Sequence, residues 1–285
     1  ACLVGSEMCI RDSLKDIAQA DSAAIWSIII GGVIFNLSNI CLSASTSIAG
    51  MSVAFPVGCG LALVLGVINN LGVEVAQGAL KSNLTLLAIG VALVVVAVIL
   101  NGAASGKKAG NAQISKADQR KGIILAVVAG VVMSFFSSFV MKAMDLKDFA
   151  NMEPGKVGPY TAIVLFSLSV LVSHFVFGPI FMKWPFQGEP VKMSEYFKGN
   201  SKTHLVGMLG GCIWCLGTAL SHITAGKAGA SVSYALGQGA PMVAAIWGVF
   251  VWKEFKGSNK IVYTLLGLMF CFFLAGLGMI VAAGM

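Results

Sequence analysis

Eight apolar segments, each about 20 residues long, constrain the fold of this chain more than any other feature. A helix of that length spans the hydrocarbon core of a bilayer, which is about 30 Å thick. Helices are expected because backbone polar groups cannot stay unsatisfied in lipid, and because the runs are continuous whereas barrel strands alternate. The segments are 24–45, 51–72, 84–102, 122–143, 159–182, 204–225, 228–251 and 261–283.

The composition agrees with this pattern and excludes several classes of protein. Of the residues, 57% are hydrophobic and only 11% are charged, whereas an average soluble domain has about 25% charged residues. An ordinary soluble enzyme, a nucleic-acid-binding protein and a disordered chain are therefore excluded. The sequence predicts an all-α polytopic membrane protein whose surroundings are the lipid bilayer.

The first residues are a separate feature. Residues 3–12 read LVGSEMCIRD, which matches the in-frame translation of a transposase sequencing adapter. We therefore interpret residues 1–13 as adapter-derived and leave them out of the fold. On this interpretation, the N-terminal part of the gene product is expected to be missing.

The loops between the segments carry most of the positive charge. Loops on one side of the membrane contain twelve lysines and arginines, and loops on the other side contain six. The positive-inside rule places the more basic side in the cytoplasm. We therefore expect a multi-pass protein of the cytoplasmic (inner) cell membrane with its C-terminus outside.

An internal repeat at an offset of 179 residues gives the strongest signal of organisation. Residues 31–102 align with 210–281 without gaps, and 16 of the 72 pairs are identical. The second repeat, 122–285, holds five segments, whereas the first, 14–104, holds only the last three; a basic loop, 105–121, joins them. Two helices are expected to be missing from a ten-helix protein. An odd number of helices per copy places the copies in opposite orientations, as in the inverted repeats of secondary transporters.

The residues that carry this repeat also carry a resemblance. The stretches GGVIFNLSN (31–39), AGMSVAFPVGCGLALVLG (49–66) and the region 214–254 resemble the drug/metabolite transporter superfamily. The similarity is greatest to the branch that holds glucose/ribose porters, rhamnose–proton symporters and ureide permeases. The resemblance implies a five-plus-five inverted repeat and solute transport by alternating access.

Polar and kinked positions inside the apolar segments are candidates for the substrate site. Asn36 and Asn39 lie three residues apart, and their amides can hydrogen-bond a polar solute. Gln238 lies between two glycines, which let a backbone approach a substrate closely. The equivalent stretch of the first repeat contains Phe55 and Pro56 and predicts a broken or kinked helix. The alternatives are hydrogen bonds between helices and a packing kink.

Aromatic residues occur at equivalent positions of the two repeats. Trp214 aligns with Phe35, and Tyr234 aligns with Phe55. Aromatic faces can stack on a ring-shaped solute, so we predict that Trp214, Tyr234 and Phe55 contribute to the substrate site. Packing within the helix bundle is the alternative for these residues.

His174 and His222 are the candidates for coupling transport to an ion, because histidine titrates near neutral pH. The alternatives are coupling through the missing helices, sodium bound by neutral ligands, or no coupling. Cys212 and Cys215 have no second ligand pair, so no metal site is predicted. The loop around Lys107 lacks the phosphate-binding pattern of nucleotide sites, and no cofactor is predicted.

These observations favour a secondary transporter of a small neutral polar solute, with a proton or sodium ion as an optional co-substrate and a homodimer as an optional assembly. A sugar is the first choice of solute. A ureide, nucleobase or other metabolite is second, and export of drugs is third. A membrane scaffold or a membrane-embedded enzyme is the alternative of another class, but the sequence contains no cluster of catalytic groups.

Overall fold

The structure is a computed structural model that describes residues 16–49, 51–109, 116–149, 152–237, 239, 242–243, 246–251 and 255–285. Its regular elements are helices, and within the described residues only two isolated bridge pairs join loop segments. The elements are α2 (Ser22–Ala49), α3 (Met51–Gln77), α4 (Leu84–Ala109), α5 (Lys116–Ala143), α6 (Pro159–Lys183), α7 (Met193–Phe197), α8 (Ser201–Ala228), α9 (Ala230–Gly237), the π-helical turn η1 (Trp247–Val251) and α11 (Lys260–Ala283).

Within this described part, seven helices are long and apolar enough to cross a bilayer, and they are all of the helices except α7, α9 and η1. Their outward faces carry large apolar side chains, such as Val164, Phe175 and Leu205, that are more than half exposed. Water would disfavour an apolar surface of that extent, whereas lipid accommodates it. The prediction of an all-α polytopic membrane protein is confirmed.

The segment 228–251, predicted as one spanning helix, differs from that prediction. Its described residues form the short helix α9, which ends at Gly237, and the separate π-helical turn η1. The sequence offers Gly237, Gly239 and Pro241 in this stretch, and glycine and proline both weaken a helix interior.

The equivalent stretch of the first repeat, in contrast, is a continuous helix. The helix α3 is continuous from Met51 to Gln77 and passes through Pro56. Of the two forms that the sequence predicted here, a broken or a kinked helix, the broken one is therefore wrong, and the kink stays a prediction. Pro56 is the sixth residue of α3, where the lack of its N–H removes a hydrogen bond next to a turn whose N–H groups already lack intrahelical partners.

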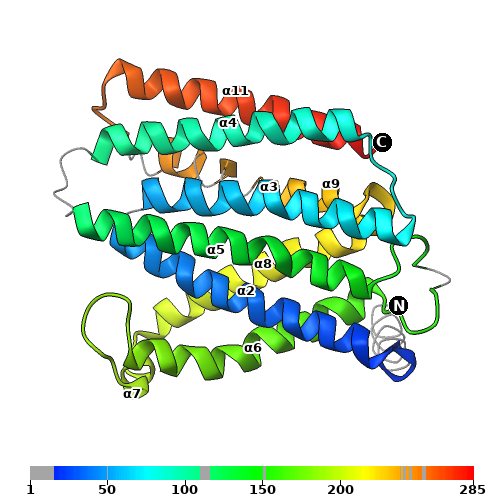
Figure 1. Cartoon of the computed structure of the whole chain (residues 1–285). Coiled ribbons are helices and arrows are strands. Elements are labelled where there is room, and N and C mark those ends of the chain that lie inside the picture. Colours follow the sequence, from blue (N-terminus) through cyan, green and yellow to red (C-terminus); the bar gives the residue numbers. More distant parts are fainter. Residues whose placement is uncertain are drawn as a thin grey trace.

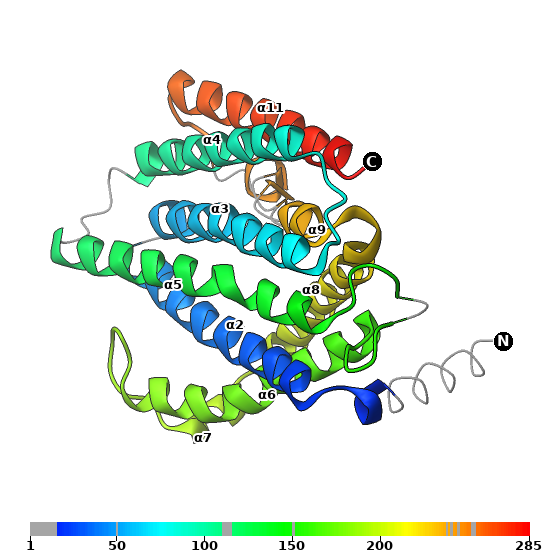
Figure 2. The same ribbon diagram turned by 45° about the vertical axis from the view of Figure 1, so that its right-hand side comes forward.

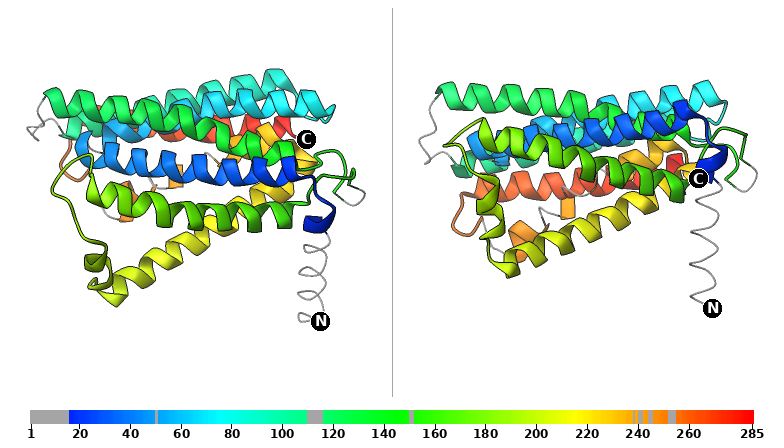
Figure 3. Two further views of the ribbon diagram at one scale, coloured as in Figure 1. Left: turned by 60° about the horizontal axis from the view of Figure 1, so that its bottom comes forward. Right: turned by 90° about the horizontal axis from the view of Figure 1, so that it is seen from below.

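The helices lie side by side, and successive helices along the chain run in opposite directions, as Figures 1 and 2 show. The helix α5 packs on both α2 and α3, and α4 pairs with α11 at one edge of the bundle. At the opposite edge, α6 and α8 lie against each other. Figure 3 shows that α8 approaches the other helices at its C-terminal end and diverges from them toward its start.

Small residues let these helices approach closely, as is usual in membrane bundles. A Cβ atom at Gly31 would lie 3.0 Å from the carbonyl oxygen of Phe136 in α5, and one at Gly32 would lie 2.7 Å from Ser169 Oγ in α6. Serine hydroxyls add hydrogen bonds across the same contacts. Ser27 Oγ donates to Phe139 O at 2.6 Å, and Ser169 Oγ donates to Ile29 O at 2.7 Å.

The helix bounds repeat with the offset seen in the sequence. The helix α2 covers Ser22–Ala49 and α8 covers Ser201–Ala228, so both their starts and their ends lie 179 residues apart. The starts of α3 and α9, at Met51 and Ala230, differ by the same number. In Figure 1, α2 and α8 run in opposite directions, as do α3 and α9, and α4 and α11.

Candidate solute cavity

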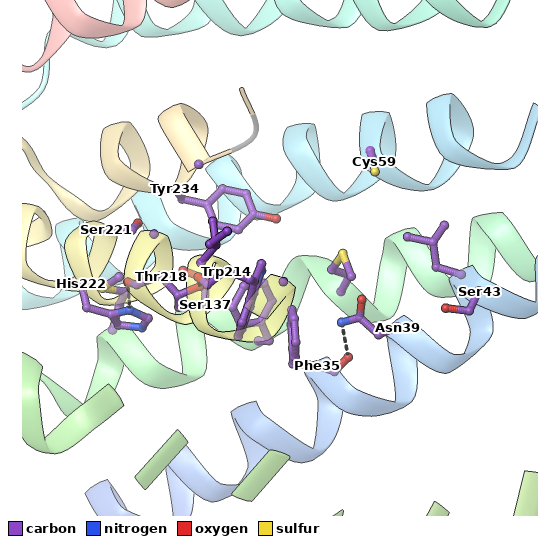
Figure 4. A pocket seen from close by; sticks show the side chains of 18 of the residues that line it. Phe35, Asn39, Ser43, Cys59, Ser137, Trp214, Thr218, Ser221, His222 and Tyr234 are labelled. Carbon is purple, nitrogen blue, oxygen red and sulfur yellow. Dashed lines mark hydrogen bonds between the residues drawn. The ribbon is translucent and has the colours of Figure 1, made fainter. Parts of the chain in front are cut away.

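A cavity of about 660 Å³ lies between α2, α3, α5, α8 and α9, a volume typical of small-molecule sites. Four aromatic rings and several small polar side chains form its lining, as the close view in Figure 4 shows. None of its described lining residues is Asp, Glu, Lys or Arg. The cavity therefore suits a neutral solute. The rings belong to Phe35, Phe136, Trp214 and Tyr234, and the polar groups to Asn39, Ser43, Thr46, Ser137, Thr218, Ser221 and His222.

Two of the aromatic rings belong to equivalent positions of the repeat. Phe35 and Trp214 stack with their ring centroids 4.7 Å apart and their planes 24° apart. The cavity thus lies beside the contact between these two equivalent positions of α2 and α8. Trp214 remains 41% exposed, so part of its surface is available to a solute.

Tyr234 forms a fixed wall of the cavity. Its hydroxyl donates to the carbonyl oxygen of Ala62 in α3 at 2.9 Å, and the side chain is buried. Gly66, one turn further along α3, leaves the space that the ring occupies, because a Cβ atom at that position would overlap the ring. The position of the Tyr234 ring therefore depends on a glycine of the other repeat.

His222 lies in the wall formed by α8 and is buried. Its Nδ1 lies 2.7 Å from the carbonyl oxygen of Thr218, whereas its Nε2 has no hydrogen-bond partner among the described residues. A carbonyl oxygen can only accept, so Nδ1 carries the hydrogen and Nε2 of the neutral ring is an acceptor. The ring can therefore accept a hydrogen bond from an N–H or O–H group.

Asn39 and Asn36, predicted to act together, lie in different environments. Asn39 lines the cavity, and its Nδ2 donates to Phe35 O at 3.0 Å. The buried Asn36 faces α6, where its Nδ2 donates to Ser173 Oγ at 3.0 Å and its Oδ1 lies 3.4 Å from His174 Nδ1. His174 is exposed on α6 and is also absent from the cavity lining. This arrangement favours the alternative of a hydrogen bond between helices for Asn36.

Three predicted site residues cannot be compared with the cavity. Gln238 lies outside the described residues, and the side chains of Phe55 and Pro56 are likewise outside the described part of α3. Conversely, the structure adds Phe136 and Ser137 of α5 and Thr218 and Ser221 of α8 to the cavity lining. Single serines and threonines are common in membrane helices, so their residue types gave no signal.

The family model and the curated relatives that match this chain have the same description. A family model described as ureide permease matches residues 107–283, which is more than half of the chain. Ureide permease 1 of Arabidopsis thaliana is 26% identical over 163 residues, which cover 57% of this chain and 42% of that protein. Ureide permeases 2 and 4 of the same plant are each 24% identical over 163 residues, 41% and 40% of their lengths.

The chain thus spans about two fifths of the length of the curated relatives that it matches. No solved structure matches it. Of the branch that the sequence resembles, these comparisons support the ureide permeases, and they do not address the sugar porters or the wider superfamily.

Proposed function

The chain belongs to the ureide permease family, and from this premise we propose that the full-length protein is a secondary transporter for a small neutral solute with amide groups, such as a ureide. The cavity at the contact between Phe35 and Trp214 carries this proposal, because equivalent positions of the two predicted repeats line it and no Asp, Glu, Lys or Arg side chain lines its described part. Alternating access requires a site of this kind, shared by the two halves.

The chemistry of the cavity fits a ureide better than a sugar, which was the first choice from the sequence. A ureide is a planar group with N–H donors and a carbonyl acceptor. A planar group can lie against the Trp214 ring, while the hydroxyls of Thr218 and Ser221 in the cavity lining can hydrogen-bond its N–H and carbonyl groups. The relatives are ureide permeases, and we therefore place the ureide first.

The experiment that tests this function is uptake into proteoliposomes that contain the full-length protein. We expect saturable uptake of labelled allantoin, a ureide, and no uptake of labelled glucose or ribose above that of protein-free vesicles. Uptake of glucose without uptake of allantoin would return the sugar to first place. Uptake of neither would contradict the proposal.

We further propose an inverted repeat of five plus five helices, with a pair equivalent to α5 and α6 packed on α8. The glycines support this arrangement. Gly31 and Gly32 of α2 touch α5 and α6, whereas their equivalents on α8, Gly210 and Gly211, have no atom within 4 Å of a built Cβ. The glycines of α2 thus have packing partners, whereas the equivalent glycines of α8 have none among the described residues. The location in the cytoplasmic membrane and the homodimer stay predictions.

A glycine substitution tests this arrangement in the full-length protein. Gly211→Leu should lower its stability in detergent about as much as Gly32→Leu, by about 1–3 kcal/mol, because each leucine would overpack a helix contact. Gly278→Leu on α11 is the matched control, since nothing lies within 4 Å of a Cβ there. Thermal unfolding measures all three variants. If Gly211→Leu is as well tolerated as Gly278→Leu, no helix pair covers this face.

A further inference from the structure

Glu74 is a buried carboxylate to which the proposed transport function assigns no role. It lies in the last turn of the candidate membrane span of α3 (Val57–Gln77), and its exposed fraction is 0%. Acidic side chains inside a membrane are costly, and they commonly mark ion or proton pathways.

One oxygen of Glu74 joins α3 to the start of α9. Its Oε1 accepts a hydrogen bond from the backbone N–H of Ser231 at 2.6 Å and another from Ser231 Oγ at 2.7 Å. Gly229, with φ +90°, brings the backbone against the carboxylate, and a Cβ atom there would lie 3.0 Å from Oε1. Positive φ favours glycine, so the connection between α8 and α9 is shaped around this carboxylate.

The other oxygen, Oε2, is buried and has no hydrogen-bond partner among the described residues. Leaving a charged oxygen buried and unsatisfied costs free energy. A proton on Oε2 removes the charge, and this carboxyl group then keeps Oε1 as the acceptor for Ser231.

The charged and titratable groups of the neighbouring elements have other surroundings. Lys81 Nζ donates to the carbonyl oxygens of Leu146 and Gly226, and Asp145 accepts from backbone N–H groups. His222 Nδ1 bonds to Thr218, and Lys142 and Lys227 are exposed. No ion pair joins any of them to Glu74 within the described residues.

A stripe on α3 connects Glu74 with the cavity. Its members, Ala62, Gly66, Asn70 and Glu74, are four residues apart and therefore share one helix face. Ala62 accepts the Tyr234 hydroxyl, and Gly66 makes room for the Tyr234 ring. Asn70 Oδ1 accepts a hydrogen bond from Ser137 Oγ, which lines the cavity, at 3.2 Å. The helix α9 is thus held to α3 at Ser231 and at Tyr234, one turn apart.

We propose that Glu74 is the proton-binding group of the transport cycle. Its Oε2 takes one proton from water on one side of the membrane and releases it to water on the other, and the solute is chemically unchanged. The ionised carboxylate holds Ser231 by charge-assisted hydrogen bonds, which weaken on protonation. Protonation thereby loosens the start of α9 and, with it, the Tyr234 wall of the cavity. This inference rests on the proposed transport function.

The test compares Glu74→Gln with the wild type in proteoliposomes of the full-length protein. With one proton per neutral solute, an inward gradient of about one pH unit supports about tenfold accumulation of allantoin. We expect Glu74→Gln to lose this accumulation, so that the inside and outside concentrations become about equal. Exchange of internal for external allantoin needs no net proton movement, and this variant should retain it. Glu153→Gln, in an exposed loop, is the matched control and should accumulate like the wild type.

Several outcomes would overturn the assignment. If proteoliposomes with the Glu74→Gln variant still accumulate allantoin under a proton gradient, Glu74 is not the proton site. If a sodium gradient drives accumulation in the wild type and the Glu74→Gln variant loses it, Glu74 belongs to a sodium site and not to a proton site. Loss of exchange together with accumulation, in a folded variant, indicates a purely structural cap of α9. If Glu74→Gln does not fold, Glu74→Asp replaces it, and this variant should keep its response to the gradient.

A second readout separates this inference from the proposed function. Infrared difference spectra of the purified protein between acidic and neutral pH should contain a carboxyl C=O band that shifts in Ser231→Ala. If the wild type transports no ureide but shows this band, the proposed function fails and the proton site stands. If the band does not respond to Ser231→Ala, the proton site fails whatever the transport result.

Discussion

Trp214→Ala should raise the KM for the transported ureide by about tenfold, which corresponds to about 1.4 kcal/mol. The indole forms one wall of the cavity and stacks on Phe35, and aromatic stacking contributes about 0.5–1.5 kcal/mol beyond the area that it buries. Both the solute contact and the support of Phe35 are lost with the ring. Initial rates of uptake over a range of allantoin concentrations measure the effect.

Two further variants show whether a raised KM in Trp214→Ala comes from the loss of the aromatic ring or from damage to α8. Leu216→Ala removes a residue of the same helix that is 63% exposed and outside the cavity lining, and it should leave KM within about twofold of the wild type. Trp214→Phe keeps an aromatic face and should recover most of the affinity. A tenfold loss in Leu216→Ala would indicate damage to α8 as a whole, and an unchanged KM in Trp214→Ala would remove this ring from the site.

Gly66→Leu should abolish uptake and destabilise the protein by about 1–3 kcal/mol, because overpacking a filled interior displaces its neighbours. The leucine side chain would occupy the place of the Tyr234 ring, whose hydroxyl then loses Ala62 O as its acceptor. Gly72→Leu is the matched control on the same helix, since nothing lies within 4 Å of a Cβ at that position. Thermal unfolding in detergent and uptake in proteoliposomes measure both effects.

The stability and uptake of Gly66→Leu, compared with those of Gly72→Leu, test the contact between α3 and Tyr234. Equal stability and equal uptake in Gly66→Leu and Gly72→Leu would contradict the close contact between α3 and Tyr234. Loss of uptake with unchanged stability would instead show that the Tyr234 wall serves the solute more than the fold.

The sequence predicted the helices well because the length of an apolar run determines whether it can cross a bilayer. It predicted a single helix over 228–251, whereas α9 ends at Gly237, and it predicted a broken or kinked helix near Pro56, where α3 is continuous. The apolar pattern is the same in continuous and interrupted helices. Whether a helix continues through a proline or glycine depends on which neighbouring groups satisfy the freed backbone, and these come from other helices.

The candidate site was predicted in part, and the helix geometry explains the rest. Trp214, Tyr234, Asn39 and His222 line the cavity. Asn36 is only three residues from Asn39, but three residues turn a helix by about 300°, and the remaining angle is enough to direct Asn36 to α6. Glu74 was not among the predicted site residues, because its burial results from the packing of α9 onto the end of α3.

The most direct test of the account is a fluorescence titration of the full-length protein in which every tryptophan except Trp214, including Trp26, Trp184, Trp247 and Trp252, is replaced by phenylalanine. Because we place the solute against the Trp214 ring, allantoin should change the fluorescence in a saturable way, at concentrations near its KM for uptake. Glucose should leave the fluorescence unchanged. A saturable response to glucose and none to allantoin would contradict the account.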